Sequence, residues 1–356
     1  MKRRLDLGLL VTVMLLVIIG LMLLYSTSAY NGKVKFDDSF YYVKKQLFAT
    51  SLGLALMYAM ANIDYHIWQR FALPAYLIAI LLSIAVLLFG DEYNGSKRWL
   101  SFGPFSFQPS EFAKIAVILF LANLIVKRGK KMKKMIELLF IMCTILPIVG
   151  LVGASNLSTA IIILGIGIVL VFVASPLYAQ FIWLGVSGVG FLTIFLALES
   201  YRLERLAIWR NPEKYEKGYQ TIQGLYAIGS GGLFGKGFGS SIQKLGFVPE
   251  AQNDMIFSIV CEEWGLVGAS ILILLFLVLI WRFFVIAMRA SDLLGSLIAT
   301  GAMAHMMIQV ILNIAVVTNT IPNTGITLPF VSYGGTSVMF LLLEMGLVLS
   351  VSSLLE

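Results

Sequence analysis

Long apolar runs alternate with short polar stretches along almost the whole chain. A run of about 20 apolar residues is long enough to cross a bilayer as a helix. By this measure the sequence predicts ten transmembrane helices, at residues 8–28, 44–62, 71–90, 110–127, 135–153, 157–174, 177–198, 255–285, 293–317 and 335–353. The predicted fold class is therefore an all-α polytopic membrane protein, formed as a single domain over residues 1–356.

Basic residues indicate how this bundle is oriented. An even number of spans places both termini on one side, and an excess of Lys and Arg marks the cytoplasmic side. Lys2, Arg3 and Arg4 precede the first span, and the basic run 127–134 falls on the same side. Both termini are therefore predicted to be cytoplasmic, with 199–254 as one large extracytoplasmic loop between helices seven and eight.

Composition and charge agree with a membrane protein. Hydrophobic residues make up 59% of the chain and charged residues 13%, against roughly 45–50% and 25% in soluble domains. The net charge of +7 is scattered between apolar spans, which fits anionic lipid surfaces and argues against nucleic-acid binding. Cys143 and Cys261 both lie in apolar segments, so neither a disulfide framework nor a CxxC metal motif is expected. The first apolar run is too long for a cleavable signal peptide.

The most informative polar interruption is 219–265, where a Gly-rich loop leads into an apolar span. Asp254 lies at that junction, and a carboxylate between water and lipid can have a raised pKa that suits proton transfer. Ser258 and Glu262 follow at i+4 and i+8, which extends a polar stripe into the span. An Asp before a helix is most often only an N-cap, but a cap needs no such stripe. We therefore interpret Asp254 as the candidate reacting group of a membrane-embedded enzyme.

A second candidate region is 95–114. Pro109, Ser110 and Glu111 have the pattern of a helix start. Lys114 lies just inside the span, three residues after Glu111, so the two side chains are expected to pair. A charged pair inside a span is costly and usually faces a cavity. With Arg98, the pair is a candidate binding site; the alternative is an interfacial anchor with a helix cap.

Two segments of the large loop are candidates for binding phosphate. Arg202, Arg205 and Arg210 fall on one side of an amphipathic helix, and Arg binds phosphate bidentately. The alternative is an interfacial helix with snorkelling Arg side chains. Residues 229–239 hold six glycines, whose exposed N–H groups, with Lys236, are suited to bind an anion. The alternative is a flexible re-entrant loop.

Further polar residues lie near the C-terminus. His305, Gln309 and Asn313 recur at i+4 steps, a pattern that interhelical hydrogen bonding also explains. The loop 318–334, which contains Ser332, is rich in Pro, Gly, Asn and Thr. Since irregular backbone cannot face lipid, this loop is expected to line a cavity.

Taken together, these motifs resemble the SEDS family (shape, elongation, division and sporulation proteins) over nearly the whole chain. The matching motifs are Arg98-Trp99, residues 108–111 with Lys114, and residues 218–220, 227–232, 235–237, 249–254, 257–258, 262–265, 322–325 and 328–335. Two positions depart from the family pattern. The usual Gln-Pro-Asp-Leu-Gly-Thr-Ala signature reads Ala-Ser-Asn-Leu-Ser-Thr-Ala at 154–160, so no role of that Asp carries over. A usual Gly is Ala315.

The resemblance implies a peptidoglycan glycosyltransferase in the bacterial cytoplasmic membrane. Such an enzyme polymerises lipid II on the outer face and releases undecaprenyl diphosphate, and the short tails resemble members that act in cell elongation. Asp254 matches the family's essential Asp, and we expect it to be the general base. A class B penicillin-binding protein is the implied partner, together with other proteins of the elongation complex and membrane lipids. The candidate substrate-binding residues are Arg98, Glu111, Lys114, Arg202, Arg205, Arg210, Lys236, Ser258, Glu262 and Ser332.

Several alternatives stay open at the level of sequence. The leaving diphosphate needs positive charge, which either Arg and Lys side chains or a divalent cation such as Mg²⁺ or Mn²⁺ would supply. A lipid II flippase would use the same intramembrane charges and outer loop. A non-catalytic scaffold for a penicillin-binding protein is the third possibility.

Overall fold

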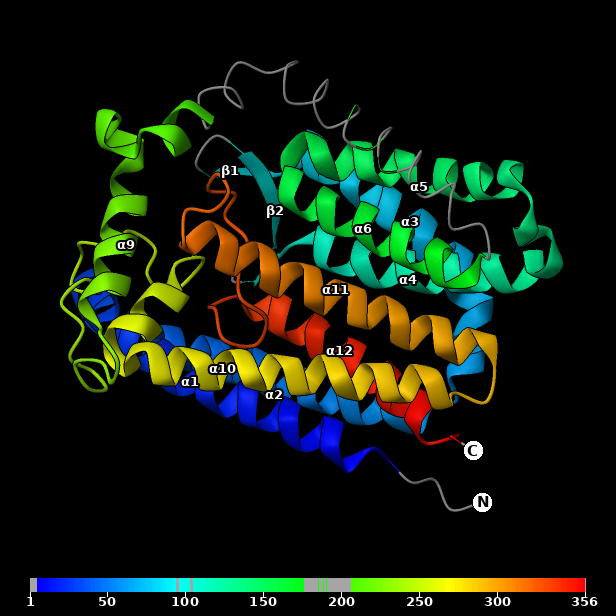
Figure 1. Ribbon diagram of the computed structural model, residues 1–356, viewed down its shortest axis with the longest axis horizontal. Coiled ribbons are helices and arrows are strands. Elements are labelled where there is room, and N and C mark those ends of the chain that lie inside the picture. Colours follow the sequence, from blue (N-terminus) through cyan, green and yellow to red (C-terminus); the bar gives the residue numbers. More distant parts are fainter. Residues whose placement is uncertain are drawn as a thin grey trace.

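The computed structural model describes residues 5–93, 96–102, 105–175, 185, 188, 190 and 206–355. Long helices run side by side between two ends of the molecule (Figure 1). Both chain termini lie at one end, which we call the terminal end. The opposite end, which carries α9 and the long loops around it, is called the loop end.

Ten numbered helices account for most of the described chain: α1 Leu7–Phe36, α2 Tyr41–Asn62, α3 Trp68–Phe89, α4 Pro109–Arg128, α5 Met135–Ser155, α6 Leu157–Ala174, α9 Tyr219–Ser230, α10 Ile256–Arg289, α11 Leu293–Val317 and α12 Gly335–Ser352. Four short 3-10 helices connect them: η1 Tyr65–Ile67, η2 Gly129–Lys133, η3 Pro212–Lys214 and η4 Glu216–Gly218. Residues 206–210 are also helical.

The helices confirm a polytopic membrane protein. Among the described residues, eight helices are long and apolar enough to cross a bilayer. The span expected at 44–62 is formed by α2, which has 22 residues and packs along α12 but is not one of those eight. The span expected at 177–198 lies outside the described residues. The count of ten and the position of the large loop therefore stay predictions.

One part of the all-α prediction is wrong. Residues 91–107 form a small antiparallel sheet of β1 Asp91–Tyr93, β2 Ser96–Phe102 and β3 Phe105–Phe107, in the order β1-β2-β3. The sequence between β1 and β2 is Asn-Gly, a strong hairpin signal. The sheet packs against α3, α4 and α5 and holds Arg98 on β2 next to the start of α4.

The bundle has a closely packed centre and a lipid-exposed rim. In both α4 and α12, 72% of the most apolar stretch is buried inside the protein, whereas the corresponding share in α3 is 28%. Polar groups on α4, α11 and α12 are therefore shielded from lipid, and these three helices can carry charges within the bundle.

The longest helix, α10, is kinked near the loop end. Gly265 has φ 65° and ψ −165°, which interrupts the helical conformation. A β-carbon at this position would lie 2.3 Å from the backbone nitrogen of Gly235. Glycine is therefore required for the Gly-rich loop to approach the helix this closely.

Candidate functional site

A cavity of about 1920 Å³ opens at the loop end of the bundle. Its walls come from α2, the sheet and the start of α4, the start of α6, the segments 208–222, 249–254 and 319–327, and the start of α12. Phe48 and Leu52 on α2, with Met339 on α12, make part of the wall apolar. Charged and apolar side chains thus share one cavity.

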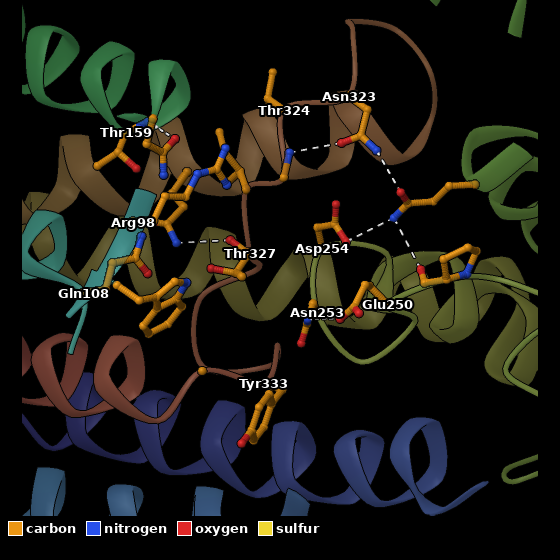
Figure 2. Close-up of a pocket in the computed structure, with 18 of the residues that line it drawn as sticks. Arg98, Gln108, Thr159, Glu250, Asn253, Asp254, Asn323, Thr324, Thr327 and Tyr333 are labelled. Carbon is orange, nitrogen blue, oxygen red and sulfur yellow. Dashed lines mark hydrogen bonds between the residues drawn. The ribbon is translucent and has the colours of Figure 1, made fainter. Parts of the chain in front are cut away.

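Asp254 lies in the turn just before α10 and lines the cavity (Figure 2). Its carboxylate oxygen Oδ1 accepts a hydrogen bond from Gln220 Nε2 at 3.3 Å. Its backbone carbonyl accepts one from Asn313 Nδ2 of α11 at 2.9 Å. Only 9% of the residue is exposed. Helices α9 and α11 therefore hold this turn in place from two sides.

The surroundings of Asp254 favour the protonated form more than water does. Burial removes water from the carboxylate and, helped by the negative charge of Glu250, raises the pKa of Asp254 to about 6. The hydrogen bond from Gln220 and the positive charge of Arg98 act in the opposite direction. At neutral pH the group is mostly ionised and is well matched to accept a proton.

Arg98 and Asp254 flank the segment 323–327 (Figure 2). A β-carbon at Gly325 would lie 3.5 Å from Arg98 Nη1 and 4.0 Å from Asp254 Oδ2. Arg98 Nε also donates to the carbonyl oxygen of Ser155, at the end of α5, at 3.3 Å. The cavity thus places a guanidinium next to the carboxylate, where a negatively charged group and a proton donor can bind side by side.

Glu111 and Lys114 form the ion pair that their spacing predicts. Lys114 Nζ lies 3.1 Å from Glu111 Oε1, the side chains are 2% and 7% exposed, and both residues line the cavity. Ser337 Oγ donates to Glu111 Oε2 at 2.9 Å, and Lys114 Nζ donates to Gln309 Oε1 at 3.0 Å. The pair is therefore part of a network that joins α4, α11 and α12.

This network continues from the cavity into the core of the bundle. Gln309 Oε1 lies 2.9 Å from His305 Nε2, and His305 Nδ1 lies 2.8 Å from Glu344 Oε2. Gln309 Nε2 donates to the carbonyl oxygen of Thr327 at 3.1 Å, which fixes the orientation of the amide. His305 Nε2 must then be a donor, so the bond between His305 and Glu344 holds one shared proton. The polar pattern of span nine is thus interhelical hydrogen bonding that reaches the cavity.

Three of the predicted binding residues lie outside the cavity and bind the protein itself. Lys236 Nζ lies 2.7 Å from Glu262 Oε1, and Glu262 also accepts from the backbone nitrogen of Ile242 at 3.2 Å. Ser258 is fully buried and its Oγ donates to the carbonyl of Met255 at 2.7 Å. In the expected polar stripe below Asp254, Glu262 therefore anchors the Gly-rich loop, Ser258 bonds only to the turn before it, and neither residue lines the cavity.

The other predicted binding residues are Ser332 and the arginines of the large loop. Ser332 Oγ donates to the carbonyl of Asn253 at 2.6 Å and accepts from the nitrogen of Leu328 at 2.8 Å, so it joins two loops. Arg210 is exposed and does not line the cavity, although its neighbour Trp209 does. Arg202 and Arg205 lie outside the described residues.

The sequence did not single out several residues that line the cavity. Lys44 and Lys45 reach it from α2, and Lys214 and Lys217 reach it from the segment before α9. The sequence signal for Lys44 and Lys45 was a pair of cations at the start of an apolar span. Nothing in the sequence tells which of these cations turn toward the cavity, because distant segments form it.

Within the described part of the chain, no group of three or more His, Cys, Asp or Glu side chains is arranged to hold a metal ion. Glu250 and Asp254 are acidic residues of one turn that both line the cavity. Mg²⁺ often binds through one or two carboxylates together with substrate phosphates. These two side chains fit that kind of site and no larger one.

The fold and the cavity define the class: a polytopic membrane protein with a polar site built between its helices and loops at one end. The family model described as "Cell cycle protein", which covers FtsW, RodA and SpoVE, matches residues 7–356. The chain belongs to this family, the SEDS family that the motifs indicated.

Relatives and solved structures are similar to this chain over nearly its full length. Stage V sporulation protein E of Bacillus subtilis is 41% identical, over 98% of this chain and 96% of the relative. A probable peptidoglycan glycosyltransferase FtsW of Trichlorobacter lovleyi is 34% identical, over 98% and 93%. A chain of a peptidoglycan synthase complex superposes with a TM-score of 0.83 at 29% identity, over 98% and 97%. RodA of Thermus thermophilus superposes with a TM-score of 0.72 at 29% identity, over 98% of this chain and 96% of the RodA chain.

Proposed function

We propose that this protein is a peptidoglycan glycosyltransferase that polymerises lipid II at the outer face of the bacterial cytoplasmic membrane. The observation that carries the proposal is a buried carboxylate, Asp254, in a cavity that also holds cations and an apolar wall. The family membership and the FtsW name of several relatives support it.

The cavity suits a substrate with a charged head and a lipid tail. Arg98, Lys114, Lys214 and Lys217 supply positive charge for a diphosphate, which cations bind strongly. Phe48 and Leu52, both on the lipid-exposed side of α2, give a polyprenyl tail an apolar path to the membrane. Lipid II combines these two chemistries in one molecule.

The reaction is a single displacement with inversion. The 4-hydroxyl of the acceptor GlcNAc attacks the anomeric carbon of the donor, the new C–O bond forms, and the bond to the diphosphate breaks. An α-linked diphosphate becomes a β-linkage, so one base suffices. Asp254 takes the hydroxyl proton, a contribution of about 10²–10⁴ in rate. Undecaprenyl diphosphate leaves with the bonding electron pair, and Arg98 and Lys114 stabilise its negative charge.

A divalent cation remains part of the proposal. Glu250 would hold it together with diphosphate oxygens and water, as Mg²⁺ accepts. Bound there, it would neutralise the leaving group. Polymerisation measured with and without a chelator, and in the Glu250→Gln variant, separates this route from support by Arg and Lys alone.

The experiment that tests the proposed function is polymerisation of purified lipid II in detergent. We expect wild-type protein, alone or with a class B penicillin-binding protein, to form glycan polymer, and Asp254→Asn to form none at unchanged folding. A scaffold would make no polymer in any form and would keep cell-wall growth with Asp254→Ala.

A lipid II flippase is the second candidate. The polar network that continues from Lys114 to Glu344 favours it, because transport needs polar groups at depth in the membrane. Detergent removes the two sides of the membrane, so a pure flippase makes no glycan there. Movement of labelled lipid II across vesicles by the Asp254→Asn variant would support transport instead.

The cellular role and the partner are the finer parts of the proposal. The short tails predicted a role in cell elongation, whereas the relatives are a sporulation protein and FtsW proteins. Complementation of cells depleted of their own RodA or FtsW decides between these roles. A class B penicillin-binding protein is proposed as partner, and the similarity to a chain of a peptidoglycan synthase complex supports it.

A further inference from the structure

Residues 232–248 form a loop segment with an unusually apolar outer surface. Large apolar side chains between 44% and 79% exposed alternate with glycines along it: Leu233, Phe234, Phe238, Ile242, Leu245 and Phe247. Water-facing loops rarely present so many large apolar groups together. Something apolar is therefore expected to cover this surface.

Both cations of the segment pair with buried carboxylates of α10, although the side chain of Lys236 is itself 32% exposed. Lys244 Nζ lies 2.6 Å from Glu263 Oε1 and 2.8 Å from Ser26 Oγ of α1, and only 7% of its side chain is exposed. Lys236 Nζ lies 2.7 Å from Glu262 Oε1. Both carboxylates are fully buried. Since residues 232–248 contain no other charged residue, their outer surface carries no unpaired charge.

The segment is docked on the side of α10 rather than above its end. The backbone nitrogens of Leu266 and Val267 donate to the carbonyls of Gly232 and Leu233 at 2.9 and 3.1 Å. A β-carbon at Gly235 would lie 2.2 Å from the carbonyl oxygen of Glu263. Leu266 and Val267 are themselves 60% and 44% exposed. The apolar surface of the segment is thus continuous with the apolar outer face of a membrane-spanning helix.

The depth of the segment follows from helix geometry. At the terminal end, Arg282 of α10 pairs with Asp6 at the start of α1, Nε to Oδ1 3.0 Å, a charged pair typical of a membrane boundary. The hydrocarbon core is about 30 Å thick, which is about 20 residues of helix. That length leads from Arg282 to Glu262 along α10, and from Asp6 to Ser26 along α1. Residues at those positions hold Lys236 and Lys244, so the segment lies at the opposite boundary.

We propose that segment 232–248 inserts its exposed Phe, Leu and Ile side chains among the lipid acyl chains of the leaflet at the loop end, as an interfacial anchor. Burial of apolar side chains at the boundary between headgroups and acyl chains is favourable. Pairing each lysine with a buried carboxylate lowers the cost of holding its charge near the hydrocarbon. This inference concerns membrane contact and does not depend on the reaction. The sequence had predicted an anion-binding loop at 229–239, with a flexible re-entrant loop as the alternative.

Depth-dependent fluorescence quenching tests the proposal on the full chain in lipid nanodiscs. A bimane label is attached at Phe234→Cys or Phe238→Cys after Cys143→Ser and Cys261→Ala. Two quenchers are compared, namely iodide in water and a phospholipid with a doxyl group near the top of its acyl chain. Leu274→Cys on the exposed face of α10 is the lipid control, and Lys35→Cys, beyond Ser26 on the exposed end of α1, is the water control.

We expect the labels at 234 and 238 to be quenched by the doxyl lipid, and several-fold less by iodide than the label at 35. Quenching by iodide equal to that at 35, with no response to the doxyl lipid, would overturn the proposal. Iodide quenching that disappears only when a class B penicillin-binding protein is added would also overturn it, in favour of a protein docking surface. Activity is not the readout, so the outcome is independent of the proposed glycosyltransferase reaction.

Discussion

At the scale of single residues, the burial of Asp254 decides how the site responds to pH. Its pKa is raised to about 6, so the carboxylate gains a proton as the pH falls through about 6. A general base must be deprotonated, and turnover should therefore fall about tenfold per pH unit below that value. Initial rates of glycan formation between pH 5 and 8 measure this. A profile that stays flat down to pH 5 would contradict the role of Asp254.

Gly325 lies where a side chain would intrude between the carboxylate and the guanidinium. Gly325→Ala places a methyl group close to Arg98 and Asp254 and forces alanine to adopt φ +69°. We expect polymerisation to drop several-fold and the protein to remain folded. Gly129→Ala is the matched control, because the residue also has a positive φ, +45°, and a β-carbon there meets nothing within 4 Å. Equal activity of the two variants would show that the space around Gly325 is not used.

His305 is expected to act on the cavity through Gln309. In a Glu344→Gln background, which avoids an unpaired buried charge, the variant His305→Gln keeps a donor near the position of Nε2, and His305→Asn does not. The first should retain most of kcat and the second should lose more, with thermal stability alike in both. Equal kcat in the two double variants would reduce the network to a purely structural role.

At the scale of elements, the Gly-rich loop is held by buried ion pairs. Lys244→Met leaves Glu263 without its partner in the protein interior, which costs about 3–5 kcal/mol in comparable cases. The double variant Lys244→Met/Glu263→Met should recover much of that loss. Thermal unfolding in detergent measures both. Lys33→Met, in the exposed pair with Asp37, is the control and should change little. A Lys244→Met variant as stable as this control would show that the Lys244–Glu263 ion pair does not stabilise the fold.

The apolar pattern predicted the helices well where lipid or a packed core sets their limits. The span expected at 293–317 is α11 with the same bounds, and 157–174 is α6. The pattern failed where a helix leaves the membrane. It predicted that the first span would end at residue 28, but α1 continues to Phe36. A helix can project from the membrane into water, because its backbone hydrogen bonds stay intact when its side chains become polar. The sheet at 91–107 was not predicted, because its strands of 3, 7 and 3 residues are too short and too mixed in polarity to give a clear apolar pattern.

At the scale of the whole molecule, the sequence identified charged residues in and near the spans but did not determine which of them contact one another. Glu111 and Lys114 were predicted to pair, whereas Lys236 was predicted to bind an anion and Glu262 to continue a polar stripe. The structure turns the first pair toward the cavity and joins the other two residues in a loop contact. Spacing within one helix predicted the first pair. The second joins residues 26 positions apart, and only the folded loop determines its direction.

Asp254 could be singled out from the sequence because its position along the chain is itself unusual. Its environment depends on α9, α10 and α11, but its place between a polar loop and an apolar span is local and readable. Its partners, Gln220 and Asn313, come from elements 34 and 59 positions away, and their roles became apparent only in the fold.

The most direct test of the account is polymerisation of purified lipid II by wild-type protein and by Asp254→Asn, in detergent at pH 7.5, with thermal unfolding as the check on folding. The account predicts glycan polymer from the wild type and none from the variant, at equal stability. Full polymerisation by a folded Asp254→Asn protein would contradict the central claim that this carboxylate accepts the proton.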